Sequence, residues 1–516
     1  MPTLYEYMNA ADNTALTAHT TFLNWTAEGS FTFKILANAA TPSATNGASI
    51  FQHSLGGDTG ADDHWTQTYV TPGTNAAGPT VRATHNGLGY TAMLNSDGHV
   101  YLYTRNLNTG AMVAYLTSSS SGQPAYGCVR MQVSGTTPVV IRVWMNDVLV
   151  ITYNDSSGTK ITAGTCAGIT AYYPNGTAPS IGNFFARPGA PPPFVVTTSP
   201  NTQPLRVIVP TAYNQNIGTH IILFAHANNG DSTDGTGRSL GSFRNALALA
   251  DAGYIVACPN MHGNNWGSPT GVTDLVDAYA YLVTTYRTRW TGLFGQSMGG
   301  VASLNAIADA RIANIRAWAG VVPVCDLPSI WQAGNGPLAA DIRYGWGLAS
   351  NGSQDSTFAT ITAGSNPTAL NPTAFNGIRM YFRASPDDTT VPSVTNTTVM
   401  AALVTGHAAS VTVAATSGPH GNPSDFNPDE LANFFATAFD TPPTITTATD
   451  LLDYTNGIET GVTLRQAIRA IAAVLAGTVT GAGTGTETFH AIGGDAPRIT
   501  VTATPAGNRT AVTSSL

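Results

Sequence analysis

The sequence WTGLFGQSMGGVASLNAIAD, residues 290–309, indicates a strand, a tight turn and a helix in immediate succession. A short apolar run at 292–294 leads into GQSMG at 295–299, and a helical pattern begins at once. Glycines placed two residues before and after a serine let the strand and helix backbones approach closely around a strained turn. Ser297 would then be exposed at a helix N-terminus, whose partial positive charge favours a developing anion. We therefore predict a nucleophilic serine; a serine in an ordinary Gly-rich turn is the alternative.

Length and composition limit the classes to which the chain can belong. Its 516 residues are enough for two to four domains, and its hydrophobic content of 43% is ordinary for globular chains. Only 10% of residues are charged, and the net charge is −8 with no basic run. These values argue against nucleic acid and against an anionic membrane surface as partners. We expect no signal peptide and no membrane span, because the N-terminus lacks a basic and an apolar region and no long apolar run follows.

The cysteines and histidines give no metal or redox signature. Cys128, Cys166, Cys258 and Cys325 fit neither a zinc spacing nor a C-x-x-C motif. Four separate buried thiols are expected, and a Cys128–Cys166 bridge stays open as an alternative. There is no H-E-x-x-H motif, no Cys/His cluster and no calcium-loop pattern, so we expect no metal and no cofactor.

The first part of the chain, residues 1–188, predicts an all-β domain. The run FTFKI at 31–35 alternates apolar and polar residues, as a half-buried strand does. VVIRVWM at 139–145 and VLVITY at 148–153 flank Asn146-Asp147, a two-residue hairpin signal. Many short strands with regular turns are typical of a sandwich or jelly roll.

Three further segments follow. Residues 189–204 are rich in proline, which favours a semi-rigid linker. Residues 205–440 alternate strands with helical stretches, which predicts a mainly parallel sheet. Residues 441–516 begin with a Pro/Thr-rich linker and continue with a helix and three short strands. That helix opens with a capping box at 463–466, and its apolar residues fall at 464, 468, 471 and 475, a seam that requires a partner.

Residues 205–440 resemble the α/β-hydrolase family, through the GQSMG turn and two later loops. In that family a serine, an acid and a histidine follow in this order, each on a loop after its strand. The resemblance implies that His420, in the loop SGPHGN, is the base that activates Ser297. It implies Asp388 as the acid, because SPDDTTVP places this aspartate three residues before Val-Pro. Asp387 and Asp326 remain as rivals.

The same resemblance implies an oxyanion hole made of two backbone N–H groups. One donor is Met298, directly after the serine, and the other is Asn228 in HANNG, residues 226–230. The family has His-Gly-x-Gly at this place, so Ala227 departs from its pattern.

Candidate substrate contacts lie on neighbouring loops. His226 begins the HANNG loop, and Trp266 follows the next predicted strand. Trp331 and Tyr344 lie in residues 326–374, where the α/β-hydrolase family inserts caps. Aromatic residues packed into the rim are the alternative interpretation.

The two ends of the chain resemble other families. VWMNDVLVITYND and AGITAYYPNGTAPSIGNFFARP resemble concanavalin-like jelly rolls, which implies a carbohydrate-binding module; a spacer is equally open. Trp65 or Tyr90 could stack on sugars, or belong to the core. The string DYTNGIETGVTLRQAIRAIAAVLAG, together with AVTSS, resembles a C-terminal module of virion proteins in phages that infect actinobacteria. That resemblance implies a minor tail protein in the virion that acts at the host cell surface, bound to other tail proteins. Because a C-terminal unit of about 70 residues is small to stand alone, we also expect a homo-oligomer, with a trimer favoured.

The leading hypothesis is therefore a multidomain protein with an N-terminal jelly roll, a central α/β-hydrolase fold and a small C-terminal helix and β module. It would be a serine esterase that cleaves an ester or acetyl group of a host cell-envelope glycan or lipid. The choice of an ester rather than an amide as substrate rests on analogy with other proteins of this fold. The alternative is a non-catalytic receptor-binding adhesin that uses a hydrolase fold as scaffold.

Overall fold

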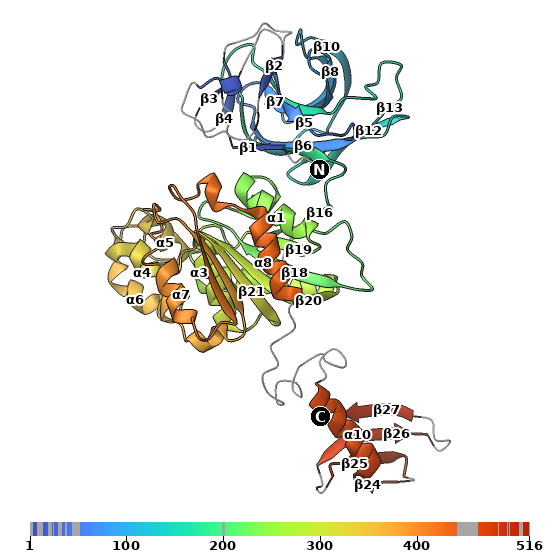
Figure 1. Cartoon of the computed structure of the whole chain (residues 1–516), viewed down its shortest axis with the longest axis vertical. Helices are drawn as coiled ribbons and strands as arrows, with labels where there is room; N and C mark the ends of the chain where they lie inside the picture. The colour runs from blue at the N-terminus through green and yellow to red at the C-terminus, as the bar shows by residue number, and fades with distance from the viewer. Residues whose placement is uncertain are drawn as a thin grey trace. The chain divides into compact units, whose positions relative to one another are not determined.

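Figure 1 shows the computed structural model of the chain, which divides into two units, Met1–Asp440 and Thr441–Leu516. The residues that the structure describes are 4–7, 14–18, 23, 25–28, 33–36, 39–43, 52–198, 202–440, 463–482, 484–492, 494, 496–504 and 509–514. Among these residues, no helix is both long enough and apolar enough to cross a membrane.

The first part of the larger unit consists of two antiparallel sheets, as the alternating sequence predicts. One sheet contains, in spatial order, β13 (Val148–Asp155), β12 (Val139–Met145), β11 (Gly127–Ser134), β6 (His64–Thr71), β15 (Ser180–Pro188), β4 (Ala39–Pro42) and β3 (Phe33–Leu36), with β1 (Leu4–Glu6) beside β15. The other contains β10 (Met112–Ser118), β9 (Val100–Asn106), β8 (Leu88–Asn95), β7 (Ala76–Ala83), β14 (Cys166–Tyr172), β5 (Gln52–Asp58) and β2 (Thr26–Glu28). A short 3-10 turn, η1 (Leu16–Ala18), precedes β2.

The predicted hairpin and the predicted sugar-stacking residues have different outcomes. Asn146 and Asp147 have φ of 48° and 71°, as the two-residue turn between β12 and β13 requires. Trp65 and Tyr90, however, are both fully buried, which corrects the suggestion that they stack on sugars. Tyr90 lies in the core between the sheets, and its hydroxyl donates to Asp155. Trp65 packs instead with Phe185 and Phe243, so both rings are covered by other side chains.

The second part of this unit is a mainly parallel sheet covered on both faces. Its strands are β16 (Phe194–Thr198), β17 (Pro204–Ile208), β19 (Ile255–Pro259), β18 (Thr219–Ala225), β20 (Thr288–Gln296), β21 (Ile315–Val321), β22 (Arg379–Ala384) and β23 (Ser410–Ala415) in spatial order. The strands from β19 to β23 run parallel, and β17 is antiparallel to both of its neighbours. Residues of α2 (Pro269–Thr285), α3 (Met298–Asp309) and α7 (Thr397–Val404) pack on one face, and residues of α1 (Leu240–Asp251) and α8 (Pro428–Asp440) on the other.

One predicted boundary changes in the structure, and the expected cap acquires defined elements. The predicted linker, 189–204, contains β16, which pairs with β17 at the edge of the parallel sheet. The many prolines favour a linker, although the apolar residues 194–196 within it form part of this edge strand. Residues 326–374, where a cap is expected, hold the helices α4 (Leu327–Trp331), α5 (Ala339–Gly345) and α6 (Phe358–Ile361) and the 3-10 turns η3 (Gln332–Gly334), η4 (Asp355–Thr357), η5 (Pro367–Ala369) and most of η6 (Pro372–Phe375). We call residues 326–374 the cap segment. A further turn, η2 (Asp234–Thr236), precedes α1, and η7 (Pro423–Asp425) precedes α8.

The smaller unit contains α10 (Leu464–Ala476) and a four-stranded antiparallel sheet. Its strands are β24 (Val479–Thr480), β25 (Thr486–His490), β26 (Pro497–Ala503) and β27 (Arg509–Ser514), one more than predicted. Thr463 and Gln466 form the predicted capping box at the start of α10. The Pro/Thr-rich stretch expected at 441–449 lies outside the described residues.

Candidate active site

Ser297 stands on the turn between β20 and α3, in a backbone conformation that non-glycine residues seldom adopt. Its φ is 50° and its ψ is −117°. Three backbone hydrogen bonds hold this conformation: the Ser297 N–H donates to Val321 O at 3.0 Å, and its carbonyl accepts from Gly300 at 2.8 Å and Val324 at 2.9 Å. Such strain, about 1–3 kcal/mol, persists only where the surroundings impose it. The predicted serine elbow (residues 295–299) is thus present.

The two glycines of the serine elbow are required by close approach. A Cβ on Gly295 would lie 2.5 Å from Ser303 Oγ and 2.6 Å from the carbonyl oxygen of Gly299. A Cβ on Gly299 would lie 2.0 Å from the carbonyl oxygen of Ala225, at the end of β18. The elbow lies so close to the neighbouring strand that a side chain at either position would clash. Both positions are therefore occupied by glycine.

The structure brings Ser297, His420 and Asp388 together. Ser297 Oγ lies 2.8 Å from His420 Nε2, and His420 Nδ1 lies 2.6 Å from Asp388 Oδ2. A carboxylate can only accept hydrogen bonds, so Nδ1 carries the proton and Nε2 is left to accept from the serine hydroxyl. The second oxygen of Asp388 accepts from the N–H groups of Thr390 and Val391 at 2.9 and 2.8 Å. These bonds orient the carboxylate, which is buried.

The two rival aspartates lie elsewhere. Asp387 accepts from the N–H of Gly418 at 3.1 Å, so it holds the histidine loop and not the imidazole. Asp326 caps α4 through the N–H of Ser329 and accepts from Asn366 and Thr368 within the cap segment. Its role in the structure is to organise that segment.

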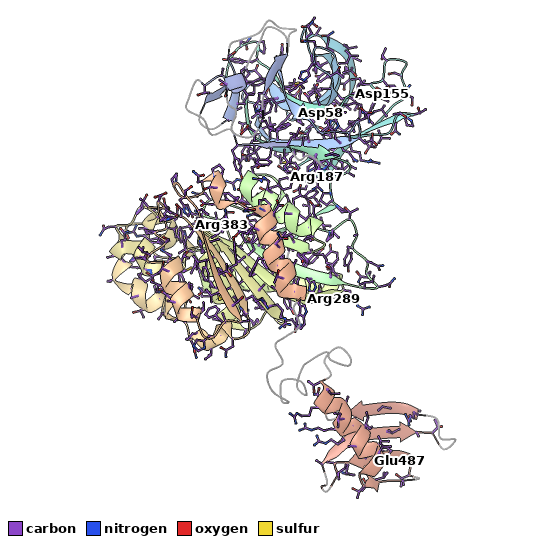
Figure 2. The ribbon with its side chains drawn as sticks, in the orientation of Figure 1. Asp58, Asp155, Arg187, Arg289, Arg383 and Glu487 are labelled. Carbon is purple, nitrogen blue, oxygen red and sulfur yellow. The ribbon has the colours of Figure 1, made fainter. Side chains whose placement is uncertain are left out.

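Arg383 and Asp425 also support the loop that carries His420. Arg383, labelled in Figure 2, lies on β22, donates to the carbonyl of Ser424 at 2.9 Å and pairs with Glu430 of α8. Asp425 is fully buried near His420 and accepts from the Thr416 hydroxyl at 2.5 Å. Burial raises the pKa of the Asp425 carboxyl. Because neither residue belongs to a sequence motif, no local pattern could have revealed their role.

The expected oxyanion donors lie on two neighbouring elements. Met298 is the first residue of α3, so its N–H has no acceptor within the helix. Residues 226–230, which we call the oxyanion loop, follow β18, whose end touches Gly299. The Asn228 side chain donates to Asp341 of α5 at 2.7 Å, and the N–H of Asn229 donates to the Asn264 side chain at 2.6 Å. The oxyanion loop is therefore held from outside by two polar contacts that no motif reveals.

The three predicted substrate contacts are buried, which corrects their assignment. The ring nitrogens of His226 lie 2.8 Å from the carbonyl oxygens of Ala227 and Asn260, so this fully buried imidazole braces two loops. Trp266 and Trp331 pack in one apolar cluster with Met298 and the cap segment. Their indole rings gain more by filling the space beneath the cap than by facing solvent. Tyr344, in contrast, is 72% exposed.

Metal and thiol chemistry receive no support from the described residues. In the ranges that the structure describes, no three His, Cys, Asp or Glu residues are grouped in a way that could hold a metal ion. All four cysteines are free and buried, so the alternative Cys128–Cys166 bridge is not formed.

Sheet order, serine elbow and side-chain geometry together make the second part of the larger unit an α/β-hydrolase-like domain. No protein-family profile and no curated protein matches the chain. Similar solved structures include a bifunctional GH43-CE protein of Bacteroides eggerthii (12% identity, 79% of this chain and 63% of that one, TM-score 0.41). Est1E of Butyrivibrio proteoclasticus is 12% identical over 48% of this chain and 99% of its own, with a TM-score of 0.36. The carboxylesterase Cest-2923 of Lactobacillus plantarum is 16% identical over 48% and 94%, with a TM-score of 0.34. The chain thus spans 63% of the length of the B. eggerthii protein.

Proposed function

We propose that this protein is a serine esterase that hydrolyses an ester or acetyl group through an acyl-enzyme. One observation carries the proposal: a continuous hydrogen-bonded chain runs from Ser297 Oγ to His420 Nε2 at 2.8 Å and from His420 Nδ1 to Asp388 at 2.6 Å. A hydroxyl, a neutral imidazole and a fixed carboxylate in this order are the parts that activate a serine.

The reaction follows from the roles of these groups. Ser297 Oγ attacks the ester carbonyl while His420 Nε2 takes its proton, and Asp388 stabilises the imidazolium that forms. The N–H groups of Met298 and Asn228 donate to the oxyanion. His420 then gives the proton to the departing alkoxide. Water attacks the acyl-enzyme with His420 as base, which releases the acid and restores the serine.

The test uses two probes on the wild type and on Ser297→Ala. We expect the wild type to hydrolyse p-nitrophenyl acetate and butyrate and to be labelled by a fluorophosphonate. Ser297→Ala should lose labelling and roughly 10⁴-fold or more in kcat, because triad residues act as a unit. If neither protein is labelled and neither turns over substrate, the esterase proposal fails and the non-catalytic adhesin takes its place.

We further propose that the protein is a minor tail protein of a phage, located in the virion and acting on the envelope of the host. This rests on the sequence resemblance of the C-terminal residues and on the esterase proposal. The substrate would be an ester of a cell-envelope glycan or lipid, and the other partners would be tail proteins. Incubation with fractionated host cell wall should release small acids detectable by mass spectrometry, and Ser297→Ala should release none.

A row of tyrosines supports a binding role for the N-terminal sandwich over a spacer role. Tyr101 and Tyr103 of β9 stack with ring centroids 6.0 Å apart, and Tyr115 of β10 lies 5.8 Å from Tyr103. Arg105 places its guanidinium 4.1 Å from the Tyr103 ring. Tyr115 is 52% exposed, so this row presents aromatic surface to solvent on which a sugar ring could stack. The alternation in HVYLYTRN places Tyr101 and Tyr103 on one face of β9.

The smaller unit supports self-association. Ile468, Ile471 and Leu475 of α10 are all exposed, whereas Ala473 faces the sheet and is buried. With Leu464 they follow a heptad spacing, in which 468 and 475 take position a and 464 and 471 position d. We propose that this apolar seam packs against the same helix of other copies. Isoleucine at position d favours trimers or tetramers.

A further inference from the structure

A cleft of about 590 Å³ opens between the start of α2 and the end of α5, and the mechanism above does not use it. One wall is the loop between β19 and α2 together with the first turn of α2, and the other is the end of α5 with the residues after it. The side chains that matter for its chemistry are His262, Asn265, Ser268, Thr270, Tyr344 and Trp346. Its volume is that of an ordinary small-molecule site.

Two aromatic rings form one wall of the cleft. Tyr344 is largely exposed, and Trp346 is half-buried. The indole N–H of Trp346 donates to the carbonyl of Trp266 at 3.0 Å, and its ring packs against the apolar cluster beneath the cap segment. Trp346 is therefore fixed in place, so that little entropy is lost when a ligand stacks on it. An aromatic face offers apolar area, and the phenol of Tyr344 adds a polar edge.

The rest of the lining combines four polar side chains with glycines and with the apolar Pro269 and Ile361. Ser268 is the N-cap residue of α2, but its hydroxyl makes no capping bond; it lies buried in the cleft wall beside the exposed Thr270. His262 is held in the wall by two contacts: its Nδ1 lies 2.6 Å from Asp274 Oδ2, and its Nε2 lies 3.1 Å from Gln203 Nε2. No Lys, Arg, Asp or Glu lines the cleft. Such a lining suits a neutral ligand rich in hydroxyl groups better than a phosphate, a carboxylate or an ammonium ion.

Both walls of the cleft are joined to the oxyanion loop. Helix α5 is only seven residues long: Asp341 near its start accepts from Asn228, and Tyr344 near its end lines the cleft. On the other wall Asn264, next to Asn265, exchanges two hydrogen bonds with Asn229, at 2.6 and 3.0 Å. A ligand in the cleft therefore lies against the same short segments that hold the proposed oxyanion donor.

We propose that this cleft binds a neutral sugar ring of the substrate, so that the ester cleaved by Ser297 is an O-acyl group on a saccharide. The inference rests on the proposed function. The bond that breaks joins the acyl carbon to a sugar oxygen, and that oxygen leaves with the proton carried by His420 while Ser297 Oγ takes the acyl group. The CH face of the sugar stacks on Tyr344 and Trp346, and its hydroxyls meet Ser268 and Thr270.

The test compares partially acetylated neutral gluco- and xylo-oligosaccharides with p-nitrophenyl acetate. In Tyr344→Ala the ratio of kcat/KM for the oligosaccharides to that for p-nitrophenyl acetate should fall about 10-fold, mainly through KM, because a lost aromatic contact costs roughly 1–1.5 kcal/mol. Tyr344→Phe should keep most of the ratio, because the ring remains. Tyr126→Ala removes an exposed tyrosine from the N-terminal sandwich and should leave the ratio unchanged.

A second readout separates this inference from the esterase proposal. Calorimetric binding of the same oligosaccharides to Ser297→Ala needs no catalysis, and adding Tyr344→Ala should weaken it about 10-fold. Failure of the wild type to turn over p-nitrophenyl acetate would refute the esterase, while unchanged binding in the double variant would refute the sugar site. If Tyr344→Ala instead lowers kcat/KM only for a long-chain p-nitrophenyl ester, the cleft binds an acyl chain and the inference is wrong.

Discussion

Asp387 and Asp388 are neighbours in the chain, but their carboxylates serve different partners. Asp388 accepts from the N–H of His420 and from two backbone N–H groups, whereas Asp387 accepts from the N–H of Gly418. Asp388→Asn should lower kcat about 10⁴-fold, since an amide favours the wrong imidazole tautomer. The measurement is steady-state hydrolysis of p-nitrophenyl acetate.

The neighbour is the control for this substitution. Asp387→Asn keeps an acceptor for the N–H of Gly418 and leaves the His420–Asp388 bond in place, so its loss should be no more than about 10-fold. Equal losses in the two variants would contradict the assignment of Asp388.

Asp234 gives the stability of the folded protein a pH dependence of known sign. Burial raises the pKa of this carboxyl from 3.8 to about 6. Between these values the folded state binds more protons than the unfolded state, so the free energy of unfolding falls as the pH rises, by up to about 3 kcal/mol. In Asp234→Asn this fall is absent. The measurement is urea unfolding of both proteins from about pH 4 to about pH 7. The free energy of unfolding of the variant, relative to the wild type, should rise up to about pH 6 and then stay constant. A difference that does not change with pH would contradict this role of Asp234.

The helix α10 exposes an apolar face, which is the proposed surface of self-association. Replacing Ile471, at the centre of its apolar seam, by aspartate places a charge where copies are proposed to pack. We expect the wild type to sediment as a multiple of 53.5 kDa and Ile471→Asp to sediment as a single chain. Arg469→Asp introduces the same side chain on this helix, outside the seam, and should leave the mass unchanged. A wild type that is already a single chain would refute the proposal.

Within the larger unit, the N-terminal sandwich and the hydrolase-like domain share buried contacts. Trp65 and Phe185 of the sandwich pack with Phe243 of α1, and Arg130 donates to Asp147 and to the carbonyl of Thr236. We expect one cooperative calorimetric transition for residues 1–440. Phe243→Ala should cost about 3–5 kcal/mol and separate this transition into two.

The matched control is a phenylalanine in the core of the hydrolase-like domain itself. Phe375 is fully buried there, and Phe375→Ala should lower stability by a similar amount. The two parts should still unfold together, because their shared contacts are intact. Two separate transitions in the wild type would show that these contacts do not couple the parts.

Several features were predictable because their causes are local. The serine elbow depends on glycines within two residues of Ser297, and the hairpin at Asn146-Asp147 depends on two residues with positive φ. The capping box of α10 likewise lies within four residues. The linker prediction failed in part at β16, since its strand character comes from pairing with β17 and not from its own composition.

The sequence by itself determined the alternation of strands and helices and the order of Ser297, Asp388 and His420, because periodicity, turns and loop positions are encoded over short stretches. Only the tertiary structure decided which of the aspartates meets the imidazole and which aromatic rings face solvent. Trp266 and Trp331 are buried and Tyr344 is exposed because residues far along the chain cover the first two. Burial of a side chain is a property of the assembled fold, and no local pattern contains it.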